Sequence, residues 1–488
     1  MRSRLGTEWS DAMTQSRPNI VLIHTDQQRG DTLSIDGHPL LTTTNLDHLA
    51  FSGARFRRAY SECPTCIPAR HALLTGVSPN ASGVVGFGPK MRIARPEATL
   101  PELLKRAGYQ TVHVGRGWHQ YPGHAHYGFE INRGDPFAEY YSRFHDLPVP
   151  ANTQHELKYQ MLHGGLTMNG HKARSWEHPE EFHQTNYAVN RTVEFLGRRD
   201  RERPFFLSVG ISAPHPPLAP PRDYLERYLS KEPDGPAIGS WATRPTNDGR
   251  GFSDQHGRQV LEGERLRETK AGYYGLIQHI DDQLEIVKMG LRGIGDEPVY
   301  VFFVSDHGEM LGDHYFWRKS MPYEGSARVP FLLSGPGIEE GTTVDEPVAL
   351  QDILPTCCEI AGVSTPEHVT GRSLLERATG ATSEPVREWL HAEHAPIGDQ
   401  GPGWHVLVSE RHKYIWFVDG TEQLFDLAED PQELEDLSGR AELSSVVSSC
   451  RERLVSALAA RPEGFSDGER LVPDRPYAYY NTLATVDT

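Results

Sequence analysis

The chain has 488 residues, 37% hydrophobic and 24% charged, a globular composition long enough for one large α/β domain with a smaller partner, or for two or three ordinary domains. Its formal net charge of −17, from 49 Lys and Arg against 66 Asp and Glu, would repel phosphate backbones, so nucleic acid is not expected as a partner. No stretch approaches the roughly 20 consecutive apolar residues of a membrane helix, so no membrane association is expected either.

The N-terminal segment and the cysteines indicate the compartment. Residues 1–17 mix Arg, Glu, Asp and Ser without an apolar run, which is not the pattern of a signal peptide. Five cysteines are too few, and odd in number, for a disulfide framework. The sequence therefore predicts a cytoplasmic protein with reduced thiols.

Short apolar runs rich in Val, Ile and Phe alternate with helical patterns. The predicted strands are Asn19–His24, Thr111–Val114, Phe205–Ile211 and Val299–Val304. The predicted helices are Thr99–Ala107, Gln184–Arg198 and Arg265–Met289. Near-continuous apolar strands are typical of a parallel sheet that is buried on both faces, and the alternation with helices predicts an open α/β sheet.

Polar side chains follow each of these four strands. Asp26 follows the first strand, His119 the second, His215 the third, and Asp306 with His307 the fourth. Active sites of open α/β sheets lie beyond the carboxyl ends of the strands, so these side chains are expected to meet.

Two long segments have the composition of surface loops. His145–His183 is polar with scattered aromatic residues, and Ser230–Gly263 is rich in Gly, Pro, Asp and Asn. Loops of this length in a compact domain are usually functional or disordered, and we expect both to cover the active site and select the substrate.

A second, smaller unit is expected near the C-terminus. The segment Thr365–Pro385 has the composition of a domain boundary, and beyond it two strand-like runs flank Asp419–Gly420, a hairpin signal. The sequence predicts a catalytic α/β domain over residues 15–375 and an α+β subdomain over residues 376–488.

The segment Cys63–Gly76 reads CPTCIPARHALLTG. As C-x-x-C it could be a redox pair or half a zinc site, but the remaining cysteines are remote and unpatterned. Counted from Cys66, it reads C-x-P-x-R followed by Leu-Thr-Gly. This pattern resembles the signature of type I sulfatases of the alkaline phosphatase superfamily, with Ala69 where the family often has Ser. Cys63 is out of register and is interpreted as a buried or an incidental thiol.

The resemblance extends over most of the chain. Similar segments are 19–27, 108–119, 214–218, 305–328, 351–363 and 414–437. It implies an alkaline-phosphatase-like fold, a mostly parallel sheet sandwiched by helices with a smaller C-terminal α+β domain. It also implies that a formylglycine-generating enzyme converts Cys66 to formylglycine (3-oxoalanine), whose hydrate supplies the nucleophilic oxygen.

Two residue pairs at strand ends are candidate metal ligands, Asp26 with Gln27 and Asp306 with His307. Hard divalent ions prefer carboxylate and amide oxygens, although a lone Asp at a strand end is as often a helix cap. The resemblance implies that both pairs bind one ion together with residue 66, Ca²⁺ in first place and Mn²⁺ or Mg²⁺ as alternatives. The Asp-Gln and Asp-His combination also resembles the phosphonate monoester hydrolase branch of the superfamily.

The resemblance assigns roles to basic residues as well. Arg70 is expected to contact formylglycine and stabilise developing charge, and Lys319 to bind a sulfate oxygen. His215, within Pro-His-Pro-Pro, is expected to protonate the leaving alcohol. His119 is expected to take the proton that expels sulfate and restores the aldehyde. Taken alone, His215 would more often be structural and Lys319 a solvated side chain.

One motif departs from the family. Many members have Gly-Lys-Trp-His where this chain has Gly115-Arg116-Gly117-Trp118-His119, without the Lys and with one extra residue. Two alternatives follow: Arg116 replaces that Lys as a substrate-binding residue through a bidentate contact, or the charge is absent.

Other polar residues receive less specific interpretations. Three on the predicted helix 265–289 are interpreted as structural or solvated: His279, Asp281 and Asp282. Three at the start of the small domain are candidates for lining the pocket: His391, His394 and Trp404.

The sequence thus predicts a sulfatase that hydrolyses sulfate monoesters of aryl or carbohydrate alcohols. The alternatives are a phosphonate monoester or phosphodiester hydrolase with the same site, and a non-catalytic sulfatase-like binding protein. The expected partner is a sulfated small molecule or saccharide, and the oligomeric state is left open.

Overall fold

A computed structural model describes residues 17–86, 93, 95–122, 124–134, 163–246, 257–396 and 401–477. Residues 145–162 of the first predicted loop and 247–256 of the second lie outside these ranges. Within them, no helix is both long and apolar enough to cross a bilayer.

The largest element is an eight-stranded sheet in the order β10-β2-β9-β7-β1-β6-β4-β5. Its strands are β1 (Asn19–Asp26), β2 (Ala54–Phe56), β4 (Gln110–Gly115), β5 (Ile131–Gly134), β6 (Phe205–Pro214), β7 (Val299–Ser305), β9 (Phe331–Ser334) and β10 (Thr342–Val344). Strand β9 runs antiparallel to its neighbours β7 and β2, while every other pair is parallel. The prediction of a mostly parallel sheet is confirmed, and all four predicted strands belong to it.

Strand β1 shows why these residues form a central strand. All eight of its residues are buried, and successive side chains enter two different cores. Ile20 and Leu22 join one core, whereas Val21 and Ile23 join the other. Each fully buried aliphatic side chain of this kind contributes about 1.5–3 kcal/mol, so a strand with two apolar faces is stable only between two helical layers.

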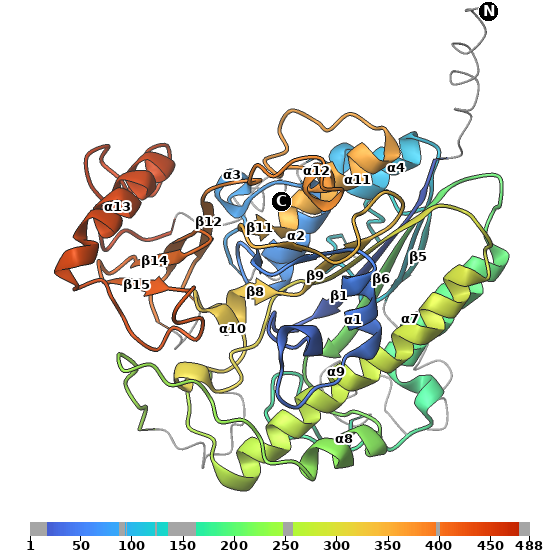
Figure 1. Cartoon of the computed structure of the whole chain (residues 1–488), viewed down its shortest axis with the longest axis horizontal. Helices are drawn as coiled ribbons and strands as arrows, with labels where there is room; N and C mark the ends of the chain where they lie inside the picture. Colours follow the sequence, from blue (N-terminus) through green and yellow to red (C-terminus); the bar gives the residue numbers. More distant parts are fainter. Residues whose placement is uncertain are drawn as a thin grey trace, which may run out of the picture.

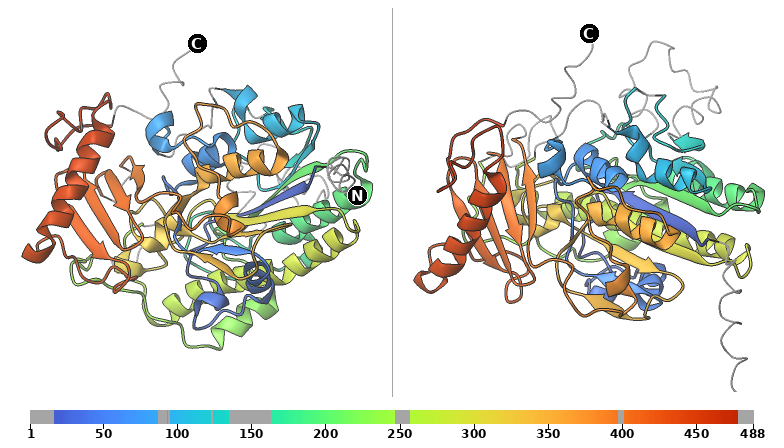
Figure 2. Two further views of the ribbon diagram at one scale, coloured as in Figure 1. Left: turned by 45° about the horizontal axis from the view of Figure 1, so that its top comes forward. Right: turned by 90° about the horizontal axis from the view of Figure 1, so that it is seen from above.

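Helices form those two layers (Figures 1 and 2). One layer contains α1 (Thr44–Phe51), α7 (Gln184–Arg198), α8 (Arg222–Leu229) and α9 (Gly263–Arg292). The other contains α2 (Cys66–Thr75), α4 (Leu100–Arg106), α11 (Ile353–Ala361) and α12 (Leu375–Ala378). The predicted helices correspond to α4, α7 and α9, and α7 has the predicted bounds.

Smaller elements complete the large unit. The short helices are α3 (Pro79–Ser82) and α10 (Glu324–Ala327). A three-stranded sheet has the order β11-β3-β8 and consists of β3 (Ala59–Tyr60), β8 (Arg328–Val329) and β11 (Val348–Ala349).

A second, antiparallel sheet follows in the chain. It consists of β12 (Leu390–His394), β13 (Trp404–Val408), β14 (His412–Phe417) and β15 (Glu422–Asp426) in sequence order. Strands β14 and β15 form the predicted hairpin. One face of this sheet packs against α13 (Ser444–Leu458) (Figure 1). The other face packs against residues that precede this sheet in the chain, such as Met321 and Tyr323. The boundary at residue 375 stays a prediction.

Candidate active site

The predicted site residues converge where the parallel strands end. Asp26 is the last residue of β1, Asp306 directly follows β7, and His215 directly follows β6. Thr25 pairs with Ser305, and Asp26 pairs with Pro214, so these three strand ends are adjacent. Cys66, the first residue of α2, lies beside them, with its Sγ 3.9 Å from Asp26 Oδ1.

Six predicted residues form a buried group, and the other four surround it. Asp26, Gln27, Arg70, Asp306 and His307 are at most 1% exposed, and Cys66 is 3% exposed. We call these six residues the Cys66 cluster. The other four side chains are partly exposed and are called the rim: Arg116, His119, His215 and Lys319. A buried polar floor with a partly exposed rim is the arrangement expected of a site that receives a small polar group from solvent.

Arg70 holds the two carboxylates of the cluster together. Its Nη2 lies 2.7 Å from Asp26 Oδ2 and 3.1 Å from Asp306 Oδ2, and its Nε donates to Asp306 Oδ2 at 3.1 Å. Its Nη1 donates to the carbonyl oxygen of Gly117 at 2.6 Å. Burial alone would raise the pKa of Asp26, but nearby positive charges, including Arg70 and Arg116, outweigh it and hold this pKa well below its ordinary value.

The thiol of Cys66 lies among both signs of charge. Its Sγ is 3.1 Å from Lys319 Nζ, 3.3 Å from His307 Nε2 and 3.9 Å from Asp26 Oδ1. Burial and Asp26 act to raise the pKa of this thiol, but Lys319 and His307 outweigh them and lower it. Residue 66 is therefore a position that favours a negatively charged atom.

The donor atoms of the cluster suit a divalent cation. One atom each from Asp26, Cys66, Asp306 and His307 lies within 4.8 Å of the others. His307 Nε2 is 3.6 Å from Asp26 Oδ1 and 3.5 Å from Asp306 Oδ1. Ligand atoms around one ion with bonds of 2.3–2.6 Å are separated by about 3.3–3.7 Å when they are at right angles, so a Ca²⁺-like ion fits this set.

Gln27 is held beside this set in a strained conformation. Its Oε1 accepts from Lys319 Nζ at 3.1 Å, its backbone N–H donates to Asp306 Oδ1 at 3.1 Å, and its φ is 74°. Arg318 and Ser320, on either side of Lys319, have φ values of 68° and 77°. Left-handed backbone at non-glycine residues costs free energy and is concentrated at functional sites, because the surrounding contacts must enforce it.

The rim histidines are neutral in the free protein. His215 Nδ1 bonds the carbonyl oxygen of Pro216 at 2.7 Å, which makes Nδ1 the protonated nitrogen and Nε2 the lone-pair nitrogen. Burial, reinforced by Lys319, lowers the pKa of His215 well below 6.5. Burial, reinforced by Arg116, does the same for the pKa of His119.

Arg116 does not project alone into the rim. Its Nε donates to Asp26 Oδ2 at 3.2 Å, and its Nη2 lies 3.4 Å from His119 Nε2. The guanidinium therefore connects the end of β4 to the Cys66 cluster. It supplies a positive charge although the Lys of the common family motif is missing.

Several contacts at the site were not predicted from the sequence. Glu309 accepts from Gln27 Nε2 at 2.5 Å and from the backbone N–H of Leu311 at 2.9 Å, and so it orients the Gln27 amide. An added Cβ at Gly308 would lie 2.1 Å from the carbonyl oxygen of Gly325, so the turn after Asp306 packs directly against the segment after Lys319. The short spacing of Asp-His-Gly-Glu was the available signal for Glu309.

The remaining predictions for polar residues divide clearly. His394 Nε2 contacts Thr65 Oγ1 at 2.6 Å, and Trp404 Nε1 donates to the carbonyl oxygen of Ser320 at 2.9 Å, so both support the residues next to Cys66 and Lys319. The prediction for His391 was wrong, because alternation along β12 puts its side chain on the opposite face of the sheet, toward α13.

The three polar residues of α9 are structural, as predicted. Asp281 accepts from the backbone N–H groups of Asn45 and Leu46 at the start of α1, at 3.1 and 2.8 Å. Asp282 accepts from the Tyr224 hydroxyl at 3.0 Å. The His279 ring is fully buried among aromatic rings.

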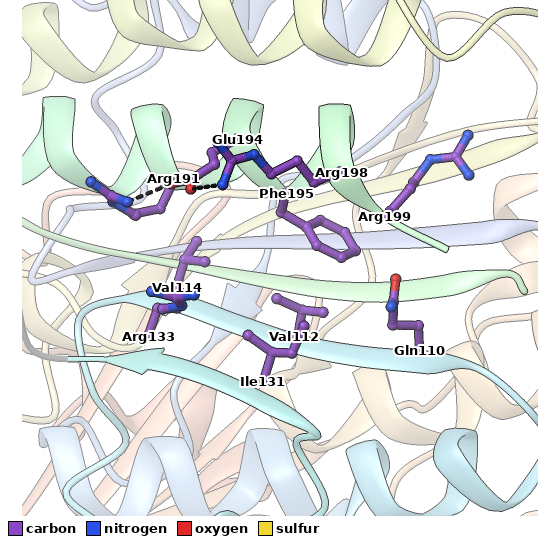
Figure 3. Close-up of a pocket in the computed structure, with 10 residues that line it drawn as sticks. All are labelled: Gln110, Val112, Val114, Ile131, Arg133, Arg191, Glu194, Phe195, Arg198 and Arg199. Carbon is purple, nitrogen blue, oxygen red and sulfur yellow. Dashed lines mark hydrogen bonds and ion pairs between the residues drawn. The ribbon is translucent and has the colours of Figure 1, made fainter. Parts of the chain in front are cut away.

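A separate cavity of about 130 Å³ lies between α7 and strands β4 and β5 (Figure 3). Val112, Val114 and Ile131 form its strand side, and the α7 residues Arg191 and Arg198 are on the other. None of its lining residues belongs to the Cys66 cluster or the rim, so it is not the reaction site.

The Sulfatase family model matches residues 18–363, and the model described as N-sulphoglucosamine sulphohydrolase, C-terminal, matches residues 312–460. The chain belongs to the sulfatase family. This sulfatase is 36% identical over 481 residues to an arylsulfatase of Clostridium perfringens, with 94% of this chain and 98% of that protein covered. The family, within the alkaline phosphatase superfamily, and the activity of a sulfuric ester hydrolase are therefore as predicted.

Two further relatives bear on the alternatives. The sulfatase is 28% identical to an ulvan-active sulfatase of Formosa agariphila, with 95% of this chain and 85% of that protein covered. Its fold resembles the crystal structure of a phosphonate monoester hydrolase of Agrobacterium radiobacter, with a TM-score of 0.73, 26% identity, and 91% of this chain and 96% of that chain covered.

Proposed function

We propose that this sulfatase hydrolyses sulfate monoesters of aryl or carbohydrate alcohols at the Cys66 cluster. One observation carries the proposal. The thiol of Cys66 has a carboxylate, an imidazole and an ammonium group within 3.9 Å, at the meeting point of three strand ends. These are the charges needed to hold a divalent cation, a nucleophile and an anionic ester in one place.

Two groups complete this site. Conversion of Cys66 to formylglycine by a formylglycine-generating enzyme would supply a hydrated aldehyde oxygen as the nucleophile. A divalent ion held by Asp26, Gln27, Asp306 and His307 would supply positive charge for the sulfate oxygens, with Ca²⁺ preferred by the oxygen-rich set and Mn²⁺ compatible with the His nitrogen.

Three basic side chains provide positive charge at the site. Arg70 spans Asp26 and Asp306 and orients both carboxylates toward residue 66. Lys319, 3.1 Å from Cys66 Sγ, binds a sulfate oxygen. Arg116 reaches the same region from β4 and replaces the Lys of the common family motif.

The two rim histidines and Asp306 accept or donate protons during the reaction. Asp306 accepts a proton from the nucleophilic group at residue 66. A bound sulfate ester adds negative charge beside His215, which raises the pKa of this imidazole and equips its Nε2 to protonate the leaving alcohol. His119, kept neutral by burial, accepts the proton whose removal releases sulfate.

The substrate class is inferred from the relatives together with the site. The arylsulfatase and the ulvan-active sulfatase act, by their names, on an aryl sulfate and a sulfated polysaccharide. Both substrates share a sulfate monoester whose charge matches the rim cations. The second candidate is phosphonate monoester hydrolysis, favoured by the Asp-Gln and Asp-His pairs and by the fold of the phosphonate monoester hydrolase.

The test compares two ester substrates on three proteins. Wild type, Cys66→Ala and the control Cys63→Ala are expressed with a formylglycine-generating enzyme. Turnover of 4-nitrophenyl sulfate and of a 4-nitrophenyl phosphonate monoester is then measured. Mass spectrometry of the tryptic peptide Ala59–Arg70 reports the state of residue 66.

The proposal expects an aldehyde or its hydrate at residue 66 and a higher kcat/KM for the sulfate. Activity should be lost in Cys66→Ala and retained in Cys63→Ala. Preference for the phosphonate would support the second candidate. An active enzyme with an unmodified thiol at residue 66 would refute the formylglycine mechanism.

A further inference from the structure

Three side chains gather on the α13 face of the small sheet, away from the Cys66 cluster. His391 and Glu393 are two residues apart on β12, so they share a face, and Glu393 pairs across the strands with His405 of β13. His394 and Trp404, which support the active site, point to the other face. The group of His391, Glu393 and His405 is therefore a separate feature of the fold.

The spacing of its polar atoms matches one metal ion. His391 Nε2 lies 3.2 Å from His405 Nδ1, and His405 Nδ1 lies 3.8 Å from Glu393 Oε2. The three ligand atoms all lie within 4.8 Å of one another. Bonds of 2.0–2.1 Å at tetrahedral angles separate ligand atoms by about 3.4 Å, so an ion with nitrogen and oxygen ligands fits with small movements of the side chains.

Tyr477 fixes the tautomer of His405. The Tyr477 hydroxyl lies 3.2 Å from the carbonyl oxygen of Trp404 and 3.2 Å from His405 Nε2. A carbonyl only accepts, so the hydroxyl donates there and its oxygen accepts from the Nε2–H of His405. His405 Nδ1 is thereby left with a lone pair directed at the other two groups, the arrangement that outer hydrogen bonds impose on metal-binding histidines.

The two imidazoles share one proton across a short contact. Without an ion, the Nε2–H of His391 donates to His405 Nδ1. With an ion bound at Nε2, this proton moves to the Nδ1 of His391, and no net proton is released from either ring.

Glu393 presents a carboxylate oxygen that needs a partner. Glu393 is 1% exposed, and its Oε2 has no hydrogen-bond partner within the part of the chain that the structure describes. Its Oε1 accepts from Arg461 Nη1 at 2.8 Å, while Arg461 Nη2 pairs with Glu463 at 2.8 Å. Two carboxyl groups thus surround one guanidinium, and the Oε2 of Glu393 is left facing His405 Nδ1 at 3.8 Å.

We propose that His391 Nε2, His405 Nδ1 and Glu393 Oε2 bind one transition-metal ion, Zn²⁺ by preference, with water as a fourth ligand. Two imidazoles and one carboxylate select such an ion over Ca²⁺ or Mg²⁺, which prefer oxygen ligands. His391 is only partly buried and gives the ion its route inward. The site would be structural, joining β12 to β13 beneath α13.

The test compares the number of Zn²⁺ ions bound per chain in wild type and in a variant. An ion at the Cys66 cluster contributes equally to both and therefore cancels. Full-length wild type, His391→Asn and the control His412→Asn are equilibrated with buffered Zn²⁺ and gel-filtered, and bound metal is measured by mass spectrometry. His412 lies on β14 of the same sheet and does not belong to the metal-ligand group. Circular dichroism and ester turnover with Ca²⁺ verify that each variant is folded.

Wild type and His412→Asn should each hold one Zn²⁺ more than His391→Asn, and only they should show the visible bands of four-coordinate Co²⁺ when that probe replaces Zn²⁺. Tyr477→Phe should keep the stoichiometry but raise the Zn²⁺ Kd about 10- to 100-fold. Equal Zn²⁺ content in folded wild type and His391→Asn would overturn the proposal. His391 and His405 would then be a hydrogen-bonded pair without a metal. This result is independent of the reaction at Cys66.

Discussion

Replacing Arg70 by Met removes the charge and the hydrogen bonds of the guanidinium but keeps a long, unbranched side chain in the same space. The loss of stability should therefore report the electrostatic role of Arg70. The side chain is fully buried and makes charged hydrogen bonds with Asp26 and Asp306, both also fully buried. Two such bonds at about 1.5–3 kcal/mol each give about 3–6 kcal/mol. Because Arg116 still contacts Asp26, we expect the lower half of this range, about 3–4 kcal/mol, for the metal-free protein.

The assay is urea unfolding with a chelator and again with saturating Ca²⁺. An ion bound between the two carboxylates would replace part of the lost positive charge, so the difference from wild type should shrink when Ca²⁺ is present. Arg57→Met, which removes a half-exposed ion pair with Asp345, is the control and should cost less than about 1 kcal/mol. If Arg70→Met matches this control under chelation, Arg70 does not hold the two carboxylates together.

Three further predictions concern charge, pH and metal. Lys319→Met should lower kcat/KM for a sulfate ester by about 10²–10³-fold, since a preorganised charge beside residue 66 is lost; an unchanged value would remove Lys319 from the reaction. Burial raises the pKa of Glu62 to about 7, so in wild type this group makes the folded state progressively less stable as pH rises from 4.5 to 7. The Glu62→Gln variant does not lose stability in this way. The difference in unfolding free energy between Glu62→Gln and wild type, measured with urea, should therefore favour the variant by about 2–3 kcal/mol more at pH 8 than at pH 5. An equal difference at both pH values would contradict the assignment. Removing divalent ions with a chelator should abolish ester turnover in wild type, and Ca²⁺ or Mn²⁺ should restore it there but not in Asp306→Asn; full activity in the chelated enzyme would exclude the metal.

The main sheet and the floor of the site followed from simple patterns in the sequence. Runs such as Asn19–His24 have two apolar faces, which only a sheet between helical layers can bury, and the polar residue after each run is placed by chain direction alone. Arg70 required one further step, because it lies 44 residues from Asp26 and 236 residues from Asp306 in sequence. The Cys66 signature supplied that step.

What the sequence did not reveal depends on long-range pairing. Whether His391 or His394 faces the active site is decided by the register of β12 against β13, and a shift of one residue would exchange them. Glu309 was missed because its role is to orient the Gln27 amide, 282 residues away in sequence, rather than to contact substrate. Such supporting contacts carry no local pattern of their own.

The direct contact between Gly308 and Gly325 sets a limit on how this enzyme can be altered by directed evolution. Even a methyl group at Gly308 would press on the neighbouring backbone and displace Asp306 and Lys319 together. Libraries aimed at new esters should therefore leave both glycines unchanged. They should place diversity in the described part of the polar segment 230–263 but spare Gly257 and Gln259, whose carbonyl oxygens accept from Trp317, two residues before Lys319.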